Sequence, residues 1–329
     1  MNKREVTKRL LSLPLICTFA LSSAQAIAQA SFPNKTIKLL VGFAAGGPTD
    51  NAARMLSLEM AKHLGQSVMV ENRPGANSLL AVNELLRSKP DGYTILLASN
   101  GSLTVAPTRI SKLPYDVRRD FTLIGPVVAY PHILVVPNAS TATDFSSFLR
   151  LAKNSNGQLN AASVGHVNDL TIEWLNSSTK SKFIRIPYRG DSAVINDLVS
   201  NRVDFALLAP NVAMPLIEGK KIKAIALTAP GGTAVPSSIK TIKESGIPEF
   251  EVEIWNSLVA PAGTPTNVVT KISAALRKAQ ENPEFQSSLA ISGQHVLTGG
   301  ADMLGKRIEL EMAQWQKIVR DAGLPMLEQ

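Results

Sequence analysis

Cysteine is nearly absent from the sequence, and so are the residue patterns of metal centres and thiol enzymes. The one cysteine, Cys17, lies in an apolar stretch near the N-terminus. The four histidines, His63, His132, His166 and His295, are far apart and show no HExxH or other ligand spacing. We therefore expect no disulfide, no cysteine nucleophile, no metal and no other cofactor in the mature chain.

Beyond residue 30 the sequence also lacks any run of about 18 uninterrupted apolar residues, the length typical of a membrane-spanning helix. Residues 1–30 have the three parts of a secretory signal peptide: basic residues up to Arg9, an apolar run at 10–21 and an A-x-A site at 28–30. Residues 24–26 form an alternative cleavage site. We favour cleavage near Ala30, because a strand-like run begins soon afterwards, and we predict a soluble, exported protein.

A strong excess of one charge is absent as well. The chain has 34 Lys and Arg against 26 Asp and Glu, and residues 1–30 hold four of the basic and one of the acidic residues. The rest carries 30 basic and 25 acidic side chains, a net charge of +5, which is too small to indicate nucleic-acid binding. With 45% hydrophobic residues and no internal repeat, the chain is typical of a globular protein rather than a disordered chain or a solenoid.

What the sequence does contain is an alternation of short, β-branched apolar runs with segments of helical periodicity. Such alternation predicts βαβ units, hence an α/β fold in two lobes, each a mainly parallel sheet flanked by helices. The predicted strands are 37–43, 67–71, 93–98, 133–136, 159–163, 183–187, 203–208 and 222–228. The predicted helices are 51–64, 78–87, 144–153, 169–178, 193–200, 212–218, 266–280, 283–292 and 303–322.

In open α/β sheets, ligands bind at the loops that follow the carboxyl ends of strands. These loops begin after Phe43, Ala98, Ser163, Pro187 and Leu208. Loops 42–50, 162–169 and 187–193 combine small residues with a following helix, whose free N–H groups and dipole favour an anion. The alternative for each is an ordinary tight turn with a helix cap. The candidate ligand-binding residues are Phe43, Ala44, Gly46, Gly47, Thr49, Asp50, Ser163, Gly165, His166, Asn168, Gly190, Asp191, Ser192 and Ala193.

Two enzyme-like segments lack the partners that their chemistry needs. Gly190-Asp191-Ser192 resembles the nucleophile block of one esterase class, but no Asp-x-x-His occurs in the chain. Residues 300–306 resemble a phosphate loop, but Arg307 takes the place of the Ser or Thr that binds Mg²⁺. We therefore predict no catalytic residue and no enzymatic activity.

Several motifs occur together in one order along the chain. They are FPNKTI at 32–37, GGPTD at 46–50, VENRPGA at 70–76, PDGYT at 90–94, PYRG at 187–190, VDF at 203–205 and VAPAGTP at 259–265. In this ordered set the chain resembles the Bug family, the periplasmic substrate-binding receptors of tripartite tricarboxylate transporters. The resemblance covers essentially the whole mature chain.

The resemblance implies a type II periplasmic binding protein of the Venus-flytrap kind. Lobe 1 would comprise residues 31–133 and 256–329, and lobe 2 residues 134–255, with crossovers near 135–137 and 254–256. The implied ligand is a small organic carboxylate, held mostly by backbone N–H groups, hydroxyls and bridging waters. The implied partners are the membrane permease subunits of the transporter. We expect a monomer in the periplasm that binds no nucleic acid.

The sequence departs from the family pattern in the candidate loops. Ala44 and Ala45 stand where two prolines are usual, and Asn77 and Ser78 stand where glycines are frequent. The loop around His166 differs as well, so that His166 and Asn168 either give specificity contacts or reflect drift. Two functions are left open: a transport receptor, or a sensory binding protein that presents its closed form to a signalling kinase.

Overall fold

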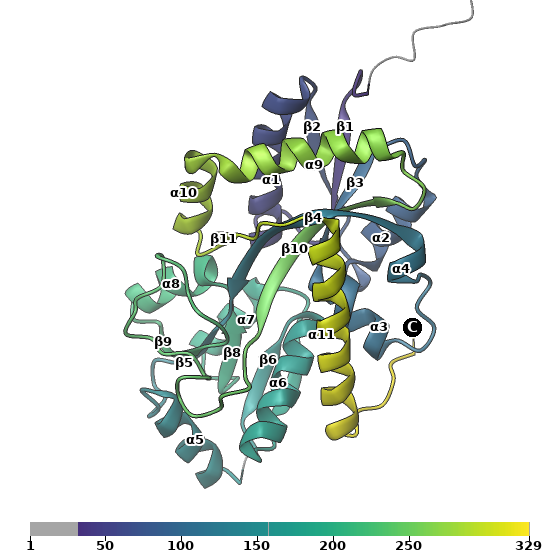
Figure 1. Ribbon diagram of the computed structural model, residues 1–329. Coiled ribbons are helices and arrows are strands. Elements are labelled where there is room, and N and C mark those ends of the chain that lie inside the picture. The colour runs from purple at the N-terminus through teal and green to yellow at the C-terminus, as the bar shows by residue number, and fades with distance from the viewer. Residues whose placement is uncertain (1–31, 157, 329) are drawn as a thin grey trace, which may run out of the picture. The chain divides into compact units, whose positions relative to one another are not determined.

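Two β-sheets organise the part of the chain that the structure describes. The structure is a computed structural model, and it describes residues 32–156 and 158–328. The predicted signal peptide, residues 1–30, lies outside the described residues. Lys35 to Gln329 form one unit, which holds both sheets (Figure 1). No helix among the described residues is long and apolar enough to cross a membrane.

The first sheet combines strands from the two ends of the chain. Its strands, in order across the sheet, are β11 (His295–Val296), β4 (Phe121–Pro131), β10 (Glu253–Pro261), β3 (Thr94–Ser99), β1 (Ile37–Val41) and β2 (Val68–Asn72). The helices of this part are α1 (Pro48–Leu64), α2 (Leu79–Arg87), α3 (Ala106–Arg109), α4 (Val117–Asp120), α9 (Thr266–Glu281), α10 (Pro283–Ile291) and α11 (Ala301–Asp321). Helix α1 packs against α9, α2 against β3, and α11 against β4.

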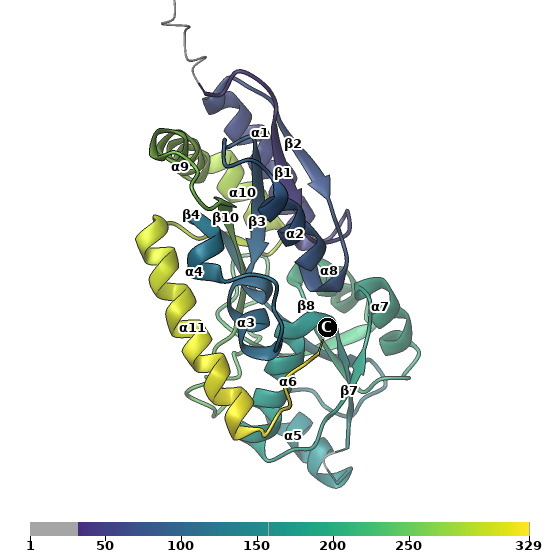
Figure 2. The same cartoon turned by 90° about the vertical axis from the view of Figure 1, so that its right-hand side faces the viewer.

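The second sheet is built from the middle of the chain alone. Its order is β7 (Ile184–Pro187), β6 (Asn160–Ser163), β8 (Phe205–Leu208), β5 (Ile133–Pro137) and β9 (Ile222–Leu227). Its helices are α5 (Phe145–Asn154), α6 (Gly165–Thr179), α7 (Asp191–Val199) and α8 (Pro210–Glu218). Figure 2 shows these elements in teal and green, below the purple and blue elements of the first sheet.

Both sheets are mixed, whereas the sequence predicted mainly parallel ones. β1 pairs in parallel with β2 and β3, and β6 pairs in parallel with β7 and β8. The long strands β4 and β10 pair with each other antiparallel, and β5 runs antiparallel to β8 and β9. β4 was not predicted because Gly125 and Pro126 are residue types typical of loops. The pairing accommodates Pro126 opposite Ser257, where the register shifts.

The chain crosses between the sheets at two places that are bonded to each other. β4 ends at Pro131 and β5 begins at Ile133, so the first change of sheet occurs at His132. The return falls between the end of β9 at Leu227 and the start of β10 at Glu253. The buried Thr228 connects the two: its hydroxyl accepts from His132 N at 2.9 Å and donates to Val252 O at 2.7 Å. The two crossing segments are therefore held together at one point.

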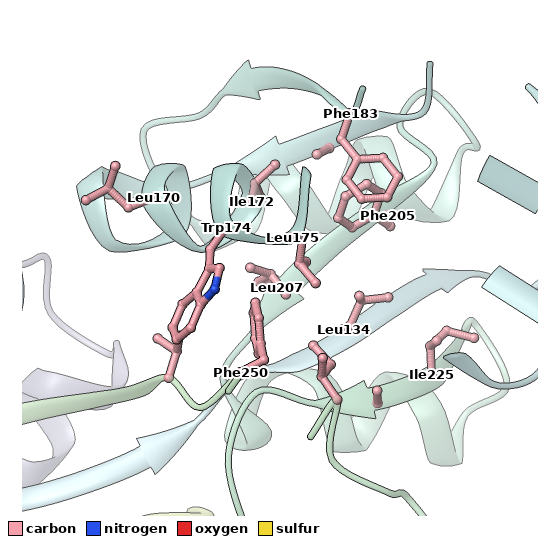
Figure 3. Close-up of a cluster of buried hydrophobic side chains, with 14 of the residues drawn as sticks. Leu134, Leu170, Ile172, Trp174, Leu175, Phe183, Phe205, Leu207, Ile225 and Phe250 are labelled. Atoms are coloured by element: carbon pink, nitrogen blue, oxygen red, sulfur yellow. The ribbon is translucent and has the colours of Figure 1, made fainter. Parts of the chain in front are cut away.

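A buried aromatic and aliphatic cluster fills the second lobe and extends to α11. Figure 3 shows Trp174 of α6 next to Phe250, with Phe183 and Phe205 on the far side of the cluster. Trp315 of α11 meets Trp174 edge to face, with ring centroids 6.2 Å apart. Such pairs add about 0.5–1.5 kcal/mol beyond the area they bury. Helix α11 therefore packs against both the first sheet and the second lobe.

Candidate ligand-binding site

A cavity of about 430 Å³ lies where five strands of the two sheets end. Its walls come from the residues that follow β1, β3, β6, β7 and β8, the five loops singled out from the sequence. Both polar and apolar residues line it, and its size suits a small organic molecule. The carboxyl ends of strands therefore converge on one site from both sheets, as is general for open α/β folds.

The wall from the first sheet is made of backbone at the start of α1. Gly47 is the N-cap of this 17-residue helix, and no side chain caps it. Pro48 has no N–H, so the backbone donors that this end offers come from Gly47, Thr49 and Asp50. Unbonded N–H groups and the helix dipole together favour an anion at this end of the cavity.

Asp50 fixes the conformation of the loop between β1 and α1. Its buried carboxylate accepts hydrogen bonds from Gly46 N, Arg54 Nε and Asn72 Nδ2, each at 2.9 Å. Asn72 Nδ2 also donates to Phe43 O at 3.0 Å. Burial opposes ionisation of Asp50, but the hydrogen bonds from Arg54, Gly46 and Asn72 outweigh it and lower its pKa. Asp50 positions the loop and does not itself line the cavity.

The wall from the second sheet contains three more helix starts. α6, α7 and α8 have N-caps Val164, Gly190 and Ala209, and no side chain bonds to the free N–H groups at any of them. All three N-cap residues line the cavity. Gly165, the first residue of α6, has a φ of 78°, which favours glycine over other residues. Four helices of nine residues or more therefore begin at this cavity without a side-chain cap.

Burial shifts the pKa of three titratable groups of the cavity toward the neutral form. Burial lowers the pKa of His132 to about 4, against a hydrogen bond with Asn168 that raises it, so this imidazole is neutral at pH 7. Burial raises the pKa of the Asp191 carboxyl. Burial also raises the pKa of the Tyr130 phenol, which stays neutral. Arg189 lies at the exposed edge of the same wall.

A hydrogen bond joins the two lobes at the mouth of the cavity. Asn77 Nδ2 and His166 Nε2 are 2.9 Å apart, and Asn77 precedes α2 whereas His166 belongs to α6. The backbone at Asn77 is strained, because Ala76, Asn77 and Ser78 have φ values of 45°, 51° and 75°. Strained backbone of this kind is frequent in segments that clamp a ligand.

A model of the tripartite tricarboxylate transporter family receptor matches residues 52–324. The chain belongs to this family. Its members are solute receptors rather than enzymes, and its fold is that of type II periplasmic binding proteins. The absence of a catalytic constellation in the sequence agrees with that membership.

Sequence relatives and solved structures of this receptor family cover nearly the whole chain. An UPF0065 protein of Bordetella pertussis is 32% identical over 94% of this chain and 96% of its own. The structure of the periplasmic binding protein BugD is similar with a TM-score of 0.81 and 31% identity, over 91% of this chain and 100% of that one. MatC of Rhodopseudomonas palustris, with bound malate, gives a TM-score of 0.79 and 31% identity, over 88% and 100%.

The receptor's cavity brings together most of the residues singled out from the sequence. Phe43, Ala44, Gly46, Gly47, Thr49, Gly165, His166, Asn168, Gly190, Asp191 and Ser192 line it, and Asp50, Ser163 and Ala193 do not. Ser163 is buried, and its hydroxyl donates to Asp169 Oδ1 at 2.8 Å, so it braces α6. Whether the lining residues contact a ligand stays a prediction.

Sequence reasoning named the loop after Ala98 but gave no candidate residue from it, and it missed the residues at the crossing point. Ser99 and Asn100 are 3% and 1% exposed, line the cavity, and leave Ser99 Oγ and Asn100 Oδ1 without a hydrogen-bond partner among the described residues. Tyr130, His132 and Ile254 line it from the crossing strands. The signal for Ser99 and Asn100 was present, since polar residues follow a buried strand there. No local pattern marks the other three.

Proposed function

We propose that this receptor captures a small organic carboxylate in the cavity and delivers it to the membrane subunits of a tripartite tricarboxylate transporter. The observation that carries the proposal is the set of four helices that begin at one cavity without side-chain caps. Unbonded N–H groups from several directions match the acceptors of a carboxylate without a charged clamp. A similar receptor, MatC, has bound malate.

The proposal includes export to the periplasm, with cleavage near Ala30, and the division into lobes at residues 133/134 and 255/256. Capture then means closure of lobe 1, residues 31–133 and 256–329, onto lobe 2, residues 134–255. Neither wall alone surrounds a small ligand, whereas sites of this size normally bury most of it. A ligand that binds the closed form more tightly shifts the receptor toward it. Thr228 lies where the crossing segments meet and is the expected pivot.

A thermal-shift screen of the purified mature protein tests capture. Malate, succinate, citrate, benzoate and amino acids are the probes. A carboxylate present at 100 times its Kd adds about 2.7 kcal/mol to the free energy of unfolding, which raises the melting temperature measurably. Small-angle scattering with the strongest hit then tests closure, and we expect a smaller radius of gyration. Failure of every carboxylate in the screen would refute the proposed ligand class.

A further inference from the structure

Asp191 lines the cavity and differs from the acidic residues in the elements around it. Asp50 is paired with Arg54, Asp169 with Arg185, and Glu253 with Arg307, at 2.9, 3.0 and 3.1 Å. Asp191 is the first residue of α7 and lines the cavity, yet among residues 32–156 and 158–328 no cation or hydrogen-bond donor pairs with its carboxylate. A negative charge thus faces the ligand space without a counter-ion from the described protein.

An unpaired, partly buried carboxylate is a costly feature. Desolvation disfavours its charge, which is why the pKa of Asp191 is raised. The dipole of α7 offsets only part of that cost, typically about 0.3–1 kcal/mol at a helix N-terminus. The Asp191 carboxylate stays unpaired in the folded cavity, and we therefore expect it to interact with the ligand.

Other polar side chains that line the cavity also leave acceptors unsatisfied. Asn100 donates through Nδ2 to Glu253 O at 3.0 Å, but its Oδ1 has no donor among the described residues. His132 is neutral at pH 7 and adds no positive charge to the cavity. A dicarboxylate without a hydroxyl has only acceptors, so it satisfies neither Asn100 Oδ1 nor an ionised Asp191. A ligand that carries N–H donors satisfies both kinds of group.

We propose that the ligand of this receptor is zwitterionic, an amino carboxylate whose ammonium group pairs with Asp191 while its carboxylate lies at the uncapped helix N-termini. The inference rests on the proposed function and narrows it from organic carboxylates to amino carboxylates. The two requirements fall on different helices: the donors are backbone N–H groups of α1, α6 and α8, and the acceptor is the side chain of the first residue of α7.

Calorimetry with matched ligand pairs tests the inference. Aspartate is compared with succinate, and glutamate with glutarate, so that the members of a pair differ by one ammonium group. We expect the amino member of at least one pair to bind the wild-type receptor at least tenfold more tightly. In Asp191→Asn we expect that affinity to fall at least tenfold and the affinity for the dicarboxylate to rise, because a repulsive charge is removed.

Asp302→Asn is the matched control. Asp302 also lies in the first turn of a helix, α11, but outside the cavity, and its loss is expected to leave every affinity unchanged. If the dicarboxylates bind wild type more tightly and Asp191→Asn keeps or weakens that binding, Asp191 acts as a protonated donor or a bystander. The zwitterion proposal then fails while the proposed function stands. If no carboxylate of either kind binds, both fail.

Discussion

The two walls of the cavity differ in the chemical groups that they present to a ligand. The wall from the first sheet presents backbone N–H groups and holds its charged residue, Asp50, behind the loop in three hydrogen bonds. The wall from the second sheet adds side chains that face the ligand space: His166, Asn168, Asp191 and Arg189. Backbone N–H groups donate hydrogen bonds to any small anion, whereas side chains distinguish one ligand from another. We infer that helix N-termini of both walls hold the anion, and that the side chains of the second wall provide the selectivity.

The largest expected effect comes from blocking the first wall. In Gly47→Val the new Cβ would have only Ala44 O within 4 Å, at 3.6 Å, so we expect the fold to tolerate it while the methyl branches block the approach to the α1 N-terminus. We expect calorimetry to detect no binding of a ligand found in the screen. Gly300→Val is the control, because Gly300 is also an uncapped N-cap glycine with open space around it. Equal binding by both variants would contradict the role assigned to the α1 N-terminus.

Acid should weaken the junction between the walls. His132 has a folded pKa of about 4 against 6.5 in its ordinary state, so the unfolded chain binds its proton first as the pH falls. The stability that neutral His132 provides is therefore present above pH 6.5 and is lost toward pH 4. We expect a loss of about 2 kcal/mol between pH 7.5 and pH 5 in urea unfolding. His132→Gln should lack this part of the acid sensitivity; an unchanged pH profile would show that His132 is not the cause.

The contact at the mouth should contribute a smaller energy. Asn77→Gly removes the hydrogen bond to His166 and suits the left-handed backbone, and His166→Ala removes it from the other side. We expect each variant to release ligand several-fold faster, because a neutral hydrogen bond contributes about 1 kcal/mol. Stopped-flow dissociation in a double-mutant cycle measures the coupling. Fully additive effects would mean that the two side chains do not act together across the mouth.

The smallest effect is expected at the one cation of the second wall. Arg189 is exposed at the edge of the cavity, and in the proposed binding mode backbone donors hold the carboxylate without it. Arg189→Gln should weaken binding by less than threefold and lower its salt dependence slightly. A loss near 3 kcal/mol in calorimetry would instead identify an arginine clamp.

Local pattern predicted the elements that are locally encoded. The apolar run before Gly42 and the helical periodicity that ends at Gly65 correspond to β1 and α1 within a few residues. β4 and β10 were both missed, and in β4 the residues Gly125, Pro126 and Pro131 resemble loop residues. Their strand character depends on pairing between segments more than a hundred residues apart, which no local pattern contains.

The same distinction applies to the site. The sequence by itself determined the α/β class, the glycine-containing loops after β1, β6 and β7, and the tendency of their helix starts to attract an anion, because these follow from neighbouring residues. Only the tertiary structure decided that Tyr130 and His132 join the same cavity, and that the Asp50 carboxylate turns away from it to bond with Gly46, Arg54 and Asn72. Convergence of strand ends from two sheets and the balance of charge inside a cavity depend on distances in space, which sequence spacing does not record.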